Sequence, residues 1–325
     1  MTLILLAAQS PTRGDMKILA RSMFLTACAS VCLASVTGRA HGQAAASDAH
    51  PQAALLPRQQ GDYRASMVPM QIPSHGVLMN ALVYVAAGAG PHPAVILLHG
   101  LPGNERNLDL AQDMRRAGWD VLYFDYRGSW GTPGDFSFSH GIEDAAAALA
   151  YLRQPAIAKR LRLDRMHFVL VGHSMGGFMA VQAAATDPDV EGVALISAAD
   201  LGALAQQTLS ADPRPTALQS ISAGLAVEGM APLNGCTSGG LARELADHRF
   251  SWTFQSKVEA LKGRPMLIVT SDDGLTDTNE KFATALRQAG DGGVTTLHLA
   301  TDHAYSDQRT ELSSALLQWL ATLAR

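Results

Sequence analysis

Cysteine, aromatic side chains and an excess of one charge are all scarce in this chain. It has three cysteines in 325 residues, 6% aromatic residues, and 25 basic against 29 acidic side chains, for a net charge of −4. No basic run or basic face stands out, so the composition gives no indication of a nucleic-acid partner. No cysteine and histidine spacing is typical of a zinc site. The hydrophobic content of 47% is that of an ordinary globular protein.

A long hydrophobic run is also missing, and this bears on the first 42 residues. Lys17 and Arg21 precede an apolar stretch from Met23 to Val36, which is shorter than the roughly 20 residues that span a bilayer. Ala40-His41-Gly42 then places small residues where a signal peptidase reads. We predict a signal peptide over residues 1–42, with Met16 as an alternative start, and no stable membrane span in the mature chain. The protein is expected to be exported, either periplasmic or secreted.

The few cysteines limit the chemistry of the mature chain. Cys28, in Leu25-Thr26-Ala27-Cys28, resembles a lipoprotein cleavage box and offers a lipid anchor as the alternative to release. Removal of the leader leaves Cys236, which cannot form an internal disulfide and lies in a loop-like sequence with no strand before it. Residues 43–62 read as a flexible linker, so one domain is predicted over 63–325.

Within that domain, strand and helix patterns alternate, which predicts a parallel sheet with helices on both faces. An antiparallel pair at the sheet edge is expected first. The alternation lapses between about 200 and 257, which we interpret as a short insertion over the strand ends. The expected strands are 67–72, 77–85, 93–98, 119–124, 168–171, 192–197, 265–270 and 294–299; the expected helices are 107–117, 142–152, 178–185, 241–246, 280–288 and 312–323.

The strongest signal in the chain is the motif Gly172-His173-Ser174-Met175-Gly176. It follows a β-prone run and leads into an alanine-rich helical pattern, which is the strand, tight turn and helix of a nucleophile elbow. Gly172 and Gly176 remove side chains that would collide with the strand or the helix. Ser174 is therefore expected to project from the sheet, near helix N–H groups that favour developing negative charge.

A serine hydroxyl is a weak nucleophile and needs a histidine base, which an acid must orient. Three histidines follow Ser174 in the chain. His298 lies within a predicted strand, and His248 lies in the insertion, ahead of the strand that offers the acid. His303 lies in a loop just after a strand, from which a base can reach the elbow. We predict His303 as the base.

The acid is expected after the strand at 265–270, where Ser271-Asp272-Asp273-Gly274 supplies two candidates. Asp273 is favoured because it lies further into the loop, and Asp272 remains the alternative. One of the two is expected to be a turn former. Asp277 and Asp302 are interpreted as ordinary loop carboxylates.

The negative oxygen formed when a serine attacks a carbonyl needs two N–H donors. One is expected from Met175, directly after the nucleophile. The other is expected from Leu101, in the loop after the strand at 93–98. Gly100 lets that backbone approach the substrate, and His99 is expected to orient the loop rather than to transfer a proton.

With Ser174, Asp273 and His303 in this order, residues 65–325 resemble the α/β-hydrolase superfamily. The segment from Asp125 to Gly134 is similar to the Tyr-Arg-Gly-x-x-Gly-x-Ser/Thr-x-Gly loop of one branch. That branch contains dienelactone-hydrolase-like enzymes, serine aminopeptidase-like proteins and prolyl oligopeptidase-type catalytic domains. The resemblance implies an eight-stranded, mostly parallel sheet flanked by helices, and neither a metal nor a cofactor. A serine stands here where dienelactone hydrolases have cysteine.

These residues favour an exported serine hydrolase that cleaves small carboxylic esters through an acyl-enzyme. A peptidase or amidase with the same residues is the alternative, and it needs a carboxylate for the substrate ammonium, such as Glu228, Glu244 or Asp247. A non-catalytic binding module is a further alternative, although no catalytic residue is missing. Acyl transfer to an acceptor other than water is also compatible. The expected pocket residues are Trp130, Trp252 and Phe254, of which the last two could instead pin the insertion to the core.

Overall fold

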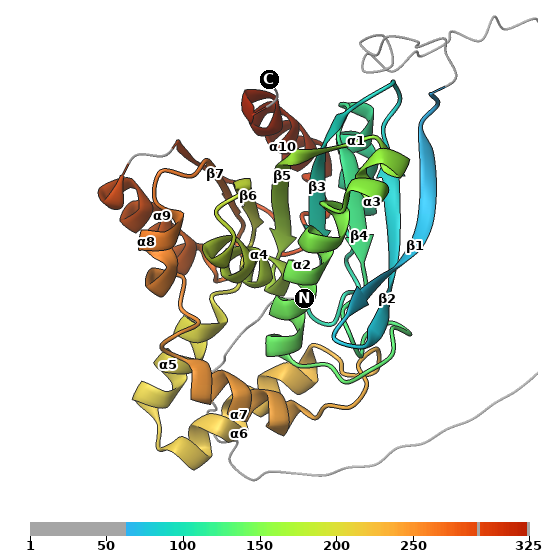
Figure 1. The fold of residues 1–325 in the computed structure, drawn as a ribbon. Helices are drawn as coiled ribbons and strands as arrows, with labels where there is room; N and C mark the ends of the chain where they lie inside the picture. Colours follow the sequence, from blue (N-terminus) through green and yellow to red (C-terminus); the bar gives the residue numbers. More distant parts are fainter. Residues whose placement is uncertain (1–62, 291–292, 324–325) are drawn as a thin grey trace, which may run out of the picture. The chain divides into compact units, whose positions relative to one another are not determined.

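An eight-stranded sheet in the order β1-β2-β4-β3-β5-β6-β7-β8 organises the protein (Figure 1). The computed structural model describes residues 63–290 and 293–323. β2 pairs antiparallel with β1 and with β4, and all other neighbours are parallel. The predicted edge hairpin and parallel sheet are confirmed. The strands are β1 (Ser66–Ser74), β2 (Val77–Val85), β3 (His92–Leu98), β4 (Asp120–Phe124), β5 (Leu163–His173), β6 (Val190–Ile196), β7 (Met266–Thr270) and β8 (Val294–His298).

Some predictions concern residues that lie outside this description. The leader over 1–42, the lipid-anchor alternative at Cys28 and the linker over 43–62 all belong to that part of the chain. Within the described residues, no helix is long and apolar enough to cross a membrane.

The central strands β3, β4, β6 and β7 are buried on both faces because helices cover each side of the sheet, whereas the edge strands β1 and β8 are largely exposed. Val95 and Leu97 of β3 contribute to the core under α1 and α10, whereas Ile96 and Leu98 contribute to the core on the opposite face. That second core holds residues of α2, α4, α8 and α9. The helices around the sheet are α1 (Leu108–Arg116), α2 (Phe138–Leu152), α3 (Pro155–Leu161), α4 (Met175–Thr186), α8 (Val258–Leu261), α9 (Thr276–Ala289) and α10 (Arg309–Leu323).

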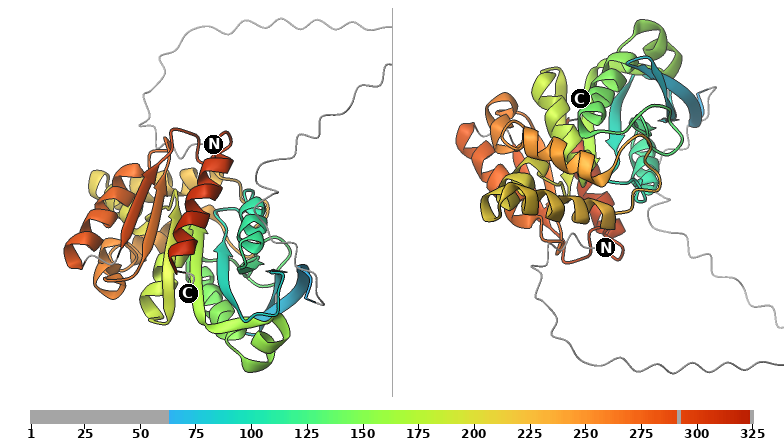
Figure 2. Two further views of the ribbon diagram at one scale, coloured as in Figure 1. Left: turned by 90° about the horizontal axis from the view of Figure 1, so that it is seen from above. Right: turned by 90° about the horizontal axis from the view of Figure 1, so that it is seen from below.

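The segment between β6 and β7 is more helical than the sequence predicts. It forms α5 (Leu201–Ala211), α6 (Arg214–Val227), α7 (Ser238–His248) and the short 3₁₀ turn η2 (Gln255–Lys257), and only the helix at 241–246 was expected. Pro213 and Pro215 lie at the start of α6, where proline is tolerated, and so they do not interrupt the helix. Helices α5 to α7 lie beyond the carboxyl ends of the strands, and α6 and α7 lie side by side there (Figures 1 and 2).

Candidate active site

Ser174 lies at the turn between β5 and α4 in a strained backbone conformation, with φ of 55° and ψ of −120°. Its N–H donates to the carbonyl of Ile196 at 2.9 Å, and its own carbonyl accepts from Ala199 N–H at 3.0 Å. These bonds to the end of β6 hold the turn in place. The serine side chain is thereby fixed at the carboxyl end of the sheet.

Two glycines make this turn sterically possible. A Cβ atom at Gly172 would lie 2.2 Å from the carbonyl oxygen of Gly176. A Cβ atom at Gly176 would lie 2.0 Å from the carbonyl oxygen of Leu98. Neither distance can be relieved by a side-chain rotation, because the obstructing atom is backbone in both cases. Gly172 and Gly176 therefore let β5, α4 and the end of β3 approach each other.

His303 and Asp273 form the central polar pair of the site. His303 Nδ1–H donates to Asp273 Oδ2 at 2.7 Å, and the N–H of Leu275 donates to Asp273 Oδ1 at 2.9 Å. Burial alone would raise the pKa of Asp273, but hydrogen bonds from His303, Ser197 and Leu275 outweigh it and lower the pKa to about 2. Asp273 is therefore ionised at neutral pH. Its exposed fraction is only 2%.

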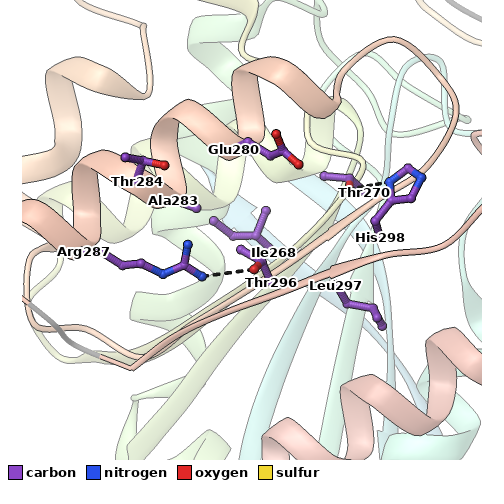
Figure 3. Close-up of a pocket in the computed structure, with 9 residues that line it drawn as sticks. All are labelled: Ile268, Thr270, Glu280, Ala283, Thr284, Arg287, Thr296, Leu297 and His298. Carbon is purple, nitrogen blue, oxygen red and sulfur yellow. Dashed lines mark hydrogen bonds between the residues drawn. The ribbon is translucent and has the colours of Figure 1, made fainter.

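The alternative acid and bases lie in other surroundings. Asp272 is exposed, and its Oδ1 lies 3.2 Å from His298 Nε2. His298 Nδ1 hydrogen-bonds Thr270 Oγ1 at 3.0 Å, within a pocket between α9 and β8 (Figure 3). His248 is exposed on α7 and stacks on Trp252 at 4.2 Å. Of these residues, only His303 is hydrogen-bonded to Asp273.

His173 connects the elbow to the His303 loop, a role that the sequence analysis did not assign. Its Nε2–H donates to the backbone carbonyl of His303 at 2.9 Å, and the two rings are 4.7 Å apart. Burial and the charge of His303 lower the pKa of His173 to about 3, so the ring is neutral at physiological pH. The residue beside the nucleophile thus holds the backbone of the base. In the sequence, the position of His173 within the elbow motif was the one feature that could have indicated this role.

This buried ring predicts a loss of stability on acidification. The unfolded chain protonates His173 below about pH 6.5, whereas the folded chain does so only near pH 3. We expect this ring to reduce the free energy of unfolding by about 2 kcal/mol between pH 6.5 and pH 5, at about 1.4 kcal/mol per unit. Urea unfolding across that range should show a shallower dependence for His173→Gln than for the unaltered protein. Identical dependences would contradict the prediction.

The loop after β3 approaches the nucleophile closely. A Cβ atom at Gly100 would lie 3.0 Å from Ser174 Cβ, so this loop runs directly beside the serine. Among the described residues, neither the Leu101 nor the Met175 backbone N–H has a hydrogen-bond acceptor. Both donors are therefore free for a ligand atom.

His99 and Trp130 hold this loop from two sides. His99 is 1% exposed, and its Nδ1–H donates to the Gly100 carbonyl at 2.8 Å. Burial lowers the pKa of His99 to about 4, which keeps the ring neutral. Trp130 Nε1–H donates to the carbonyl of Pro102 at 2.6 Å, while the Arg106 guanidinium lies 4.3 Å from the indole ring. Trp130 was predicted as a pocket residue, and these contacts give it a loop-anchoring position.

Trp252 and Phe254 both lie in the hydrophobic core, which is the position that the sequence analysis gave as the alternative to lining a pocket. Phe254 is fully buried and lies 5.1 Å from the ring of Phe282 in α9. Trp252 packs edge-on against Phe138 and Phe178, at 6.4 Å and 5.5 Å. These aromatic contacts fasten the insertion to the helices beneath it, which is why the two rings are enclosed.

Ser174 Oγ has no hydrogen-bond partner among the described residues. The hydrogen bond between a serine nucleophile and its histidine base is often long in an unliganded site, and it shortens when substrate binds. Among the described residues, no group of three histidine, cysteine, aspartate or glutamate side chains is arranged to hold a metal ion. The arrangement at Ser174 is suited to acyl transfer: a serine at an elbow, a histidine held by an ionised carboxylate, and two free N–H donors.

Comparison with known proteins identifies the family. Residues 93–255 match the family described as the alpha/beta hydrolase fold, and the chain belongs to this family. The predicted membership is thereby confirmed. No curated protein matches the chain in sequence.

Solved structures with the same fold include several esterases. A thermostable carboxyl esterase from Bacillus coagulans is 17% identical, with a TM-score of 0.58, over 79% of this chain and 99% of that one. A Pyrococcus furiosus esterase is 13% identical, with a TM-score of 0.56, over 83% of this chain and 99% of that one. A fungal esterase from Rhizomucor miehei is 18% identical, with a TM-score of 0.60, over 80% of this chain and 84% of that one. At these identities the similarity establishes the fold.

Proposed function

We propose that this protein is a serine hydrolase that cleaves carboxylic esters, with Ser174 as nucleophile, His303 as base and Asp273 as the orienting acid. The observation that carries the proposal is the 2.7 Å bond from His303 Nδ1 to Asp273 Oδ2, in a loop that His173 fastens beside the elbow. This bond fixes the tautomer in which Nε2 of His303 is free to accept a proton. The esterase structures that share the fold support the choice of ester substrates.

The proposed reaction proceeds through an acyl-enzyme. Ser174 Oγ attacks the ester carbonyl while His303 Nε2 takes the proton of the Ser174 hydroxyl. The carbonyl oxygen thereby becomes negative. The N–H groups of Met175 and Leu101 stabilise this oxygen, each contributing about 10²–10³ in rate. His303 then donates the proton to the departing alcohol, and water activated by the same histidine releases the acid.

The peptidase alternative needs a carboxylate to bind the substrate ammonium, and two of the three candidates already bind other groups of the protein. Glu244 accepts hydrogen bonds from the N–H groups of Phe138 and Ser139, at 3.0 Å and 2.9 Å, and so caps α2. Asp247 pairs with Arg214 at 2.6 Å on the surface. Glu228, at the end of α6, is left as the carboxylate that could bind a substrate ammonium. Burial raises the pKa of Glu228, and the charge of His303 partly offsets this rise.

The decisive experiment compares two substrates of the same purified protein. We expect hydrolysis of a short-chain p-nitrophenyl ester, with no turnover of an aminoacyl p-nitroanilide, and labelling of Ser174 by a fluorophosphonate. Ser174→Ala is the matched control for all three measurements. Turnover of the anilide would establish the peptidase instead, and the absence of both turnover and labelling would favour a binding module.

We also propose that the protein is exported to the periplasm or the medium. The support is the sequence of residues 1–42, with basic residues before a short apolar stretch and Ala40-His41-Gly42 after it. N-terminal sequencing of the mature protein tests this proposal. A chain that begins near residue 43 is expected, whereas a blocked N-terminus at Cys28 would indicate a lipid anchor.

A further inference from the structure

Trp130 contacts two segments that are far apart in the sequence. Its Nε1–H donates to the carbonyl of Pro102 at 2.6 Å, in the loop that follows β3. Its backbone N–H donates to the carbonyl of Pro232 at 2.9 Å, in the segment between α6 and α7. One residue therefore joins the loop that carries the Leu101 donor to the helical insertion.

The loop after β3 is held on both sides of Leu101. On one side, His99 Nδ1–H donates to the Gly100 carbonyl, which shares a planar peptide group with the Leu101 N–H. The direction of that carbonyl therefore sets the direction in which the N–H points. On the other side, Trp130 holds the carbonyl of Pro102. Leu101 thus lies between two peptide carbonyls that both accept from ring N–H groups.

Gly103 lets the two rings reach this loop. Its φ is 103°, and a Cβ atom there would lie 2.6 Å from both His99 Nδ1 and Trp130 Nε1. Both ring nitrogens therefore lie against the same backbone turn. The Arg106 guanidinium covers the indole at 4.3 Å, and Arg106 Nε–H donates to the Gly103 carbonyl at 3.4 Å. The indole is thereby held against the loop at its face as well as at its edge.

The backbone around Trp130 is fixed by contacts with the insertion. Asn234 N–H donates to the Gly128 carbonyl at 2.7 Å, and Phe136 N–H donates to the Asn234 carbonyl at 2.9 Å. The φ of Trp130 is 49°, in the left-handed region that non-glycine residues rarely adopt. Backbone strain of this kind persists only where the surroundings enforce it. The contacts with the insertion therefore fix the backbone from which the indole reaches the loop.

We propose that Trp130 is a positioning residue for the reaction, because it holds the Leu101 N–H at the place where the carbonyl oxygen becomes negative. Hydrogen-bond donors accelerate such a reaction when they are in place before the charge forms. A displacement of about 1 Å in an active site can lower the rate by about 10²-fold. This inference rests on the proposed function, in which Leu101 supplies one of the two donors. A merely structural Trp130 would contribute to stability without changing the rate constants of the folded enzyme.

Trp130→Phe tests the role of the indole N–H, because it removes this donor and keeps an aromatic ring beside Arg106. We expect kcat for a p-nitrophenyl ester to fall by about ten-fold, less than the 10²–10³ of a deleted donor, since the Leu101 N–H is displaced rather than lost. The expected change in KM is less than about two-fold, because the negative oxygen exists only in the transition state. The pH profile of kcat/KM should keep its shape, because His303 and Asp273 retain their contacts.

Inhibition by a trifluoromethyl ketone provides the second measurement. Ser174 Oγ adds to the carbonyl carbon of this inhibitor, the hydroxyl proton passes to His303, and the carbonyl oxygen becomes negative. The adduct therefore resembles the transition state and needs the same two N–H donors. Trp130→Phe is expected to raise the inhibition constant by about the ten-fold factor by which it lowers kcat. A loss of stability alone would leave the inhibition constant of the folded protein unchanged.

Two further variants make each failure distinguishable. Trp319→Phe, the same substitution at a buried tryptophan of α10, should leave kcat and the inhibition constant unchanged. Arg106→Met removes the cation over the indole, is expected to lower kcat by about three-fold, and replaces Trp130→Phe as the test if that variant does not fold.

The possible outcomes separate this inference from the proposed function. Unchanged kcat and inhibition constants in folded Trp130→Phe would overturn the positioning role and leave the hydrolase intact. A loss that appears in KM, or one that shifts the pH profile, would also overturn it. If the unaltered protein neither hydrolyses the ester nor binds the ketone, the proposed function itself is wrong.

Discussion

Replacing Asp273 with asparagine is expected to lower kcat for ester hydrolysis by about 10⁴-fold, because the base would be held in the wrong tautomer. The ionised carboxylate now accepts the Nδ1 hydrogen of His303, which leaves Nε2 free. An asparagine can instead donate its amide hydrogen to Nδ1, and Nε2 would then carry the proton. The substrate should still bind, so the expected change in KM is small.

The neighbouring aspartate provides the matched control. Asp272 is exposed and lies beside His298, so Asp272→Asn is expected to change kcat by less than about two-fold. Steady-state kinetics on a p-nitrophenyl ester, with circular dichroism to verify the fold, compare both variants. A large loss for Asp272→Asn with near-normal activity for Asp273→Asn would reverse the assignment of the acid.

Replacing Asp144 with alanine is expected to lower the free energy of unfolding by about 3–5 kcal/mol, the usual result of breaking a buried ion pair from one side. Asp144 is fully buried and accepts from Arg127 Nε at 2.6 Å, Arg127 N–H at 2.8 Å and Ser74 Oγ at 2.6 Å. Its removal leaves the guanidinium, which is itself buried, without this partner.

The adjacent glutamate separates this effect from the loss of any acid near Arg127. Glu143 also pairs with Arg127, at 2.5 Å, but its side chain is 43% exposed. Glu143→Ala is therefore expected to cost no more than about 1 kcal/mol. Urea unfolding of both variants measures the difference. Similar losses at the two positions would show that the burial of Asp144 does not determine how much its ion pair with Arg127 contributes to the free energy of unfolding.

Local sequence patterns were sufficient to predict the sheet and the elbow. The central strands are continuous apolar runs because helices cover both of their faces, and each run stands out from the polar loops beside it. The glycines around Ser174 are required by backbone contacts within and next to the motif, so that signal is also local. The candidate acid and base could be proposed because the family resemblance fixes their order along the chain.

The remaining features depend on contacts between distant segments. Phe254 packs on Phe282, and Tyr305 bonds Ser197 across more than a hundred residues of chain, so neither pairing leaves a local pattern. The prolines around α6 were ambiguous, because the same residue begins a helix and interrupts one. An aromatic residue in the insertion could equally line a cavity or close the core, and only packing decides between them.

The pairing of β6 with β7 makes the helical segment between them a replaceable module. These strands pair directly, from Val193 with Met266 to Ile196 with Val269, although α5, α6 and α7 separate them in the sequence. The register that sets Ser174 and Asp273 at the same end of the sheet is therefore fixed by strand contacts. New helices could be grafted between the two strands, provided that the enclosed aromatic anchors are retained. The strands that carry Ser174 and Asp273 would keep their register through such an exchange, because it leaves the pairing of β6 with β7 intact.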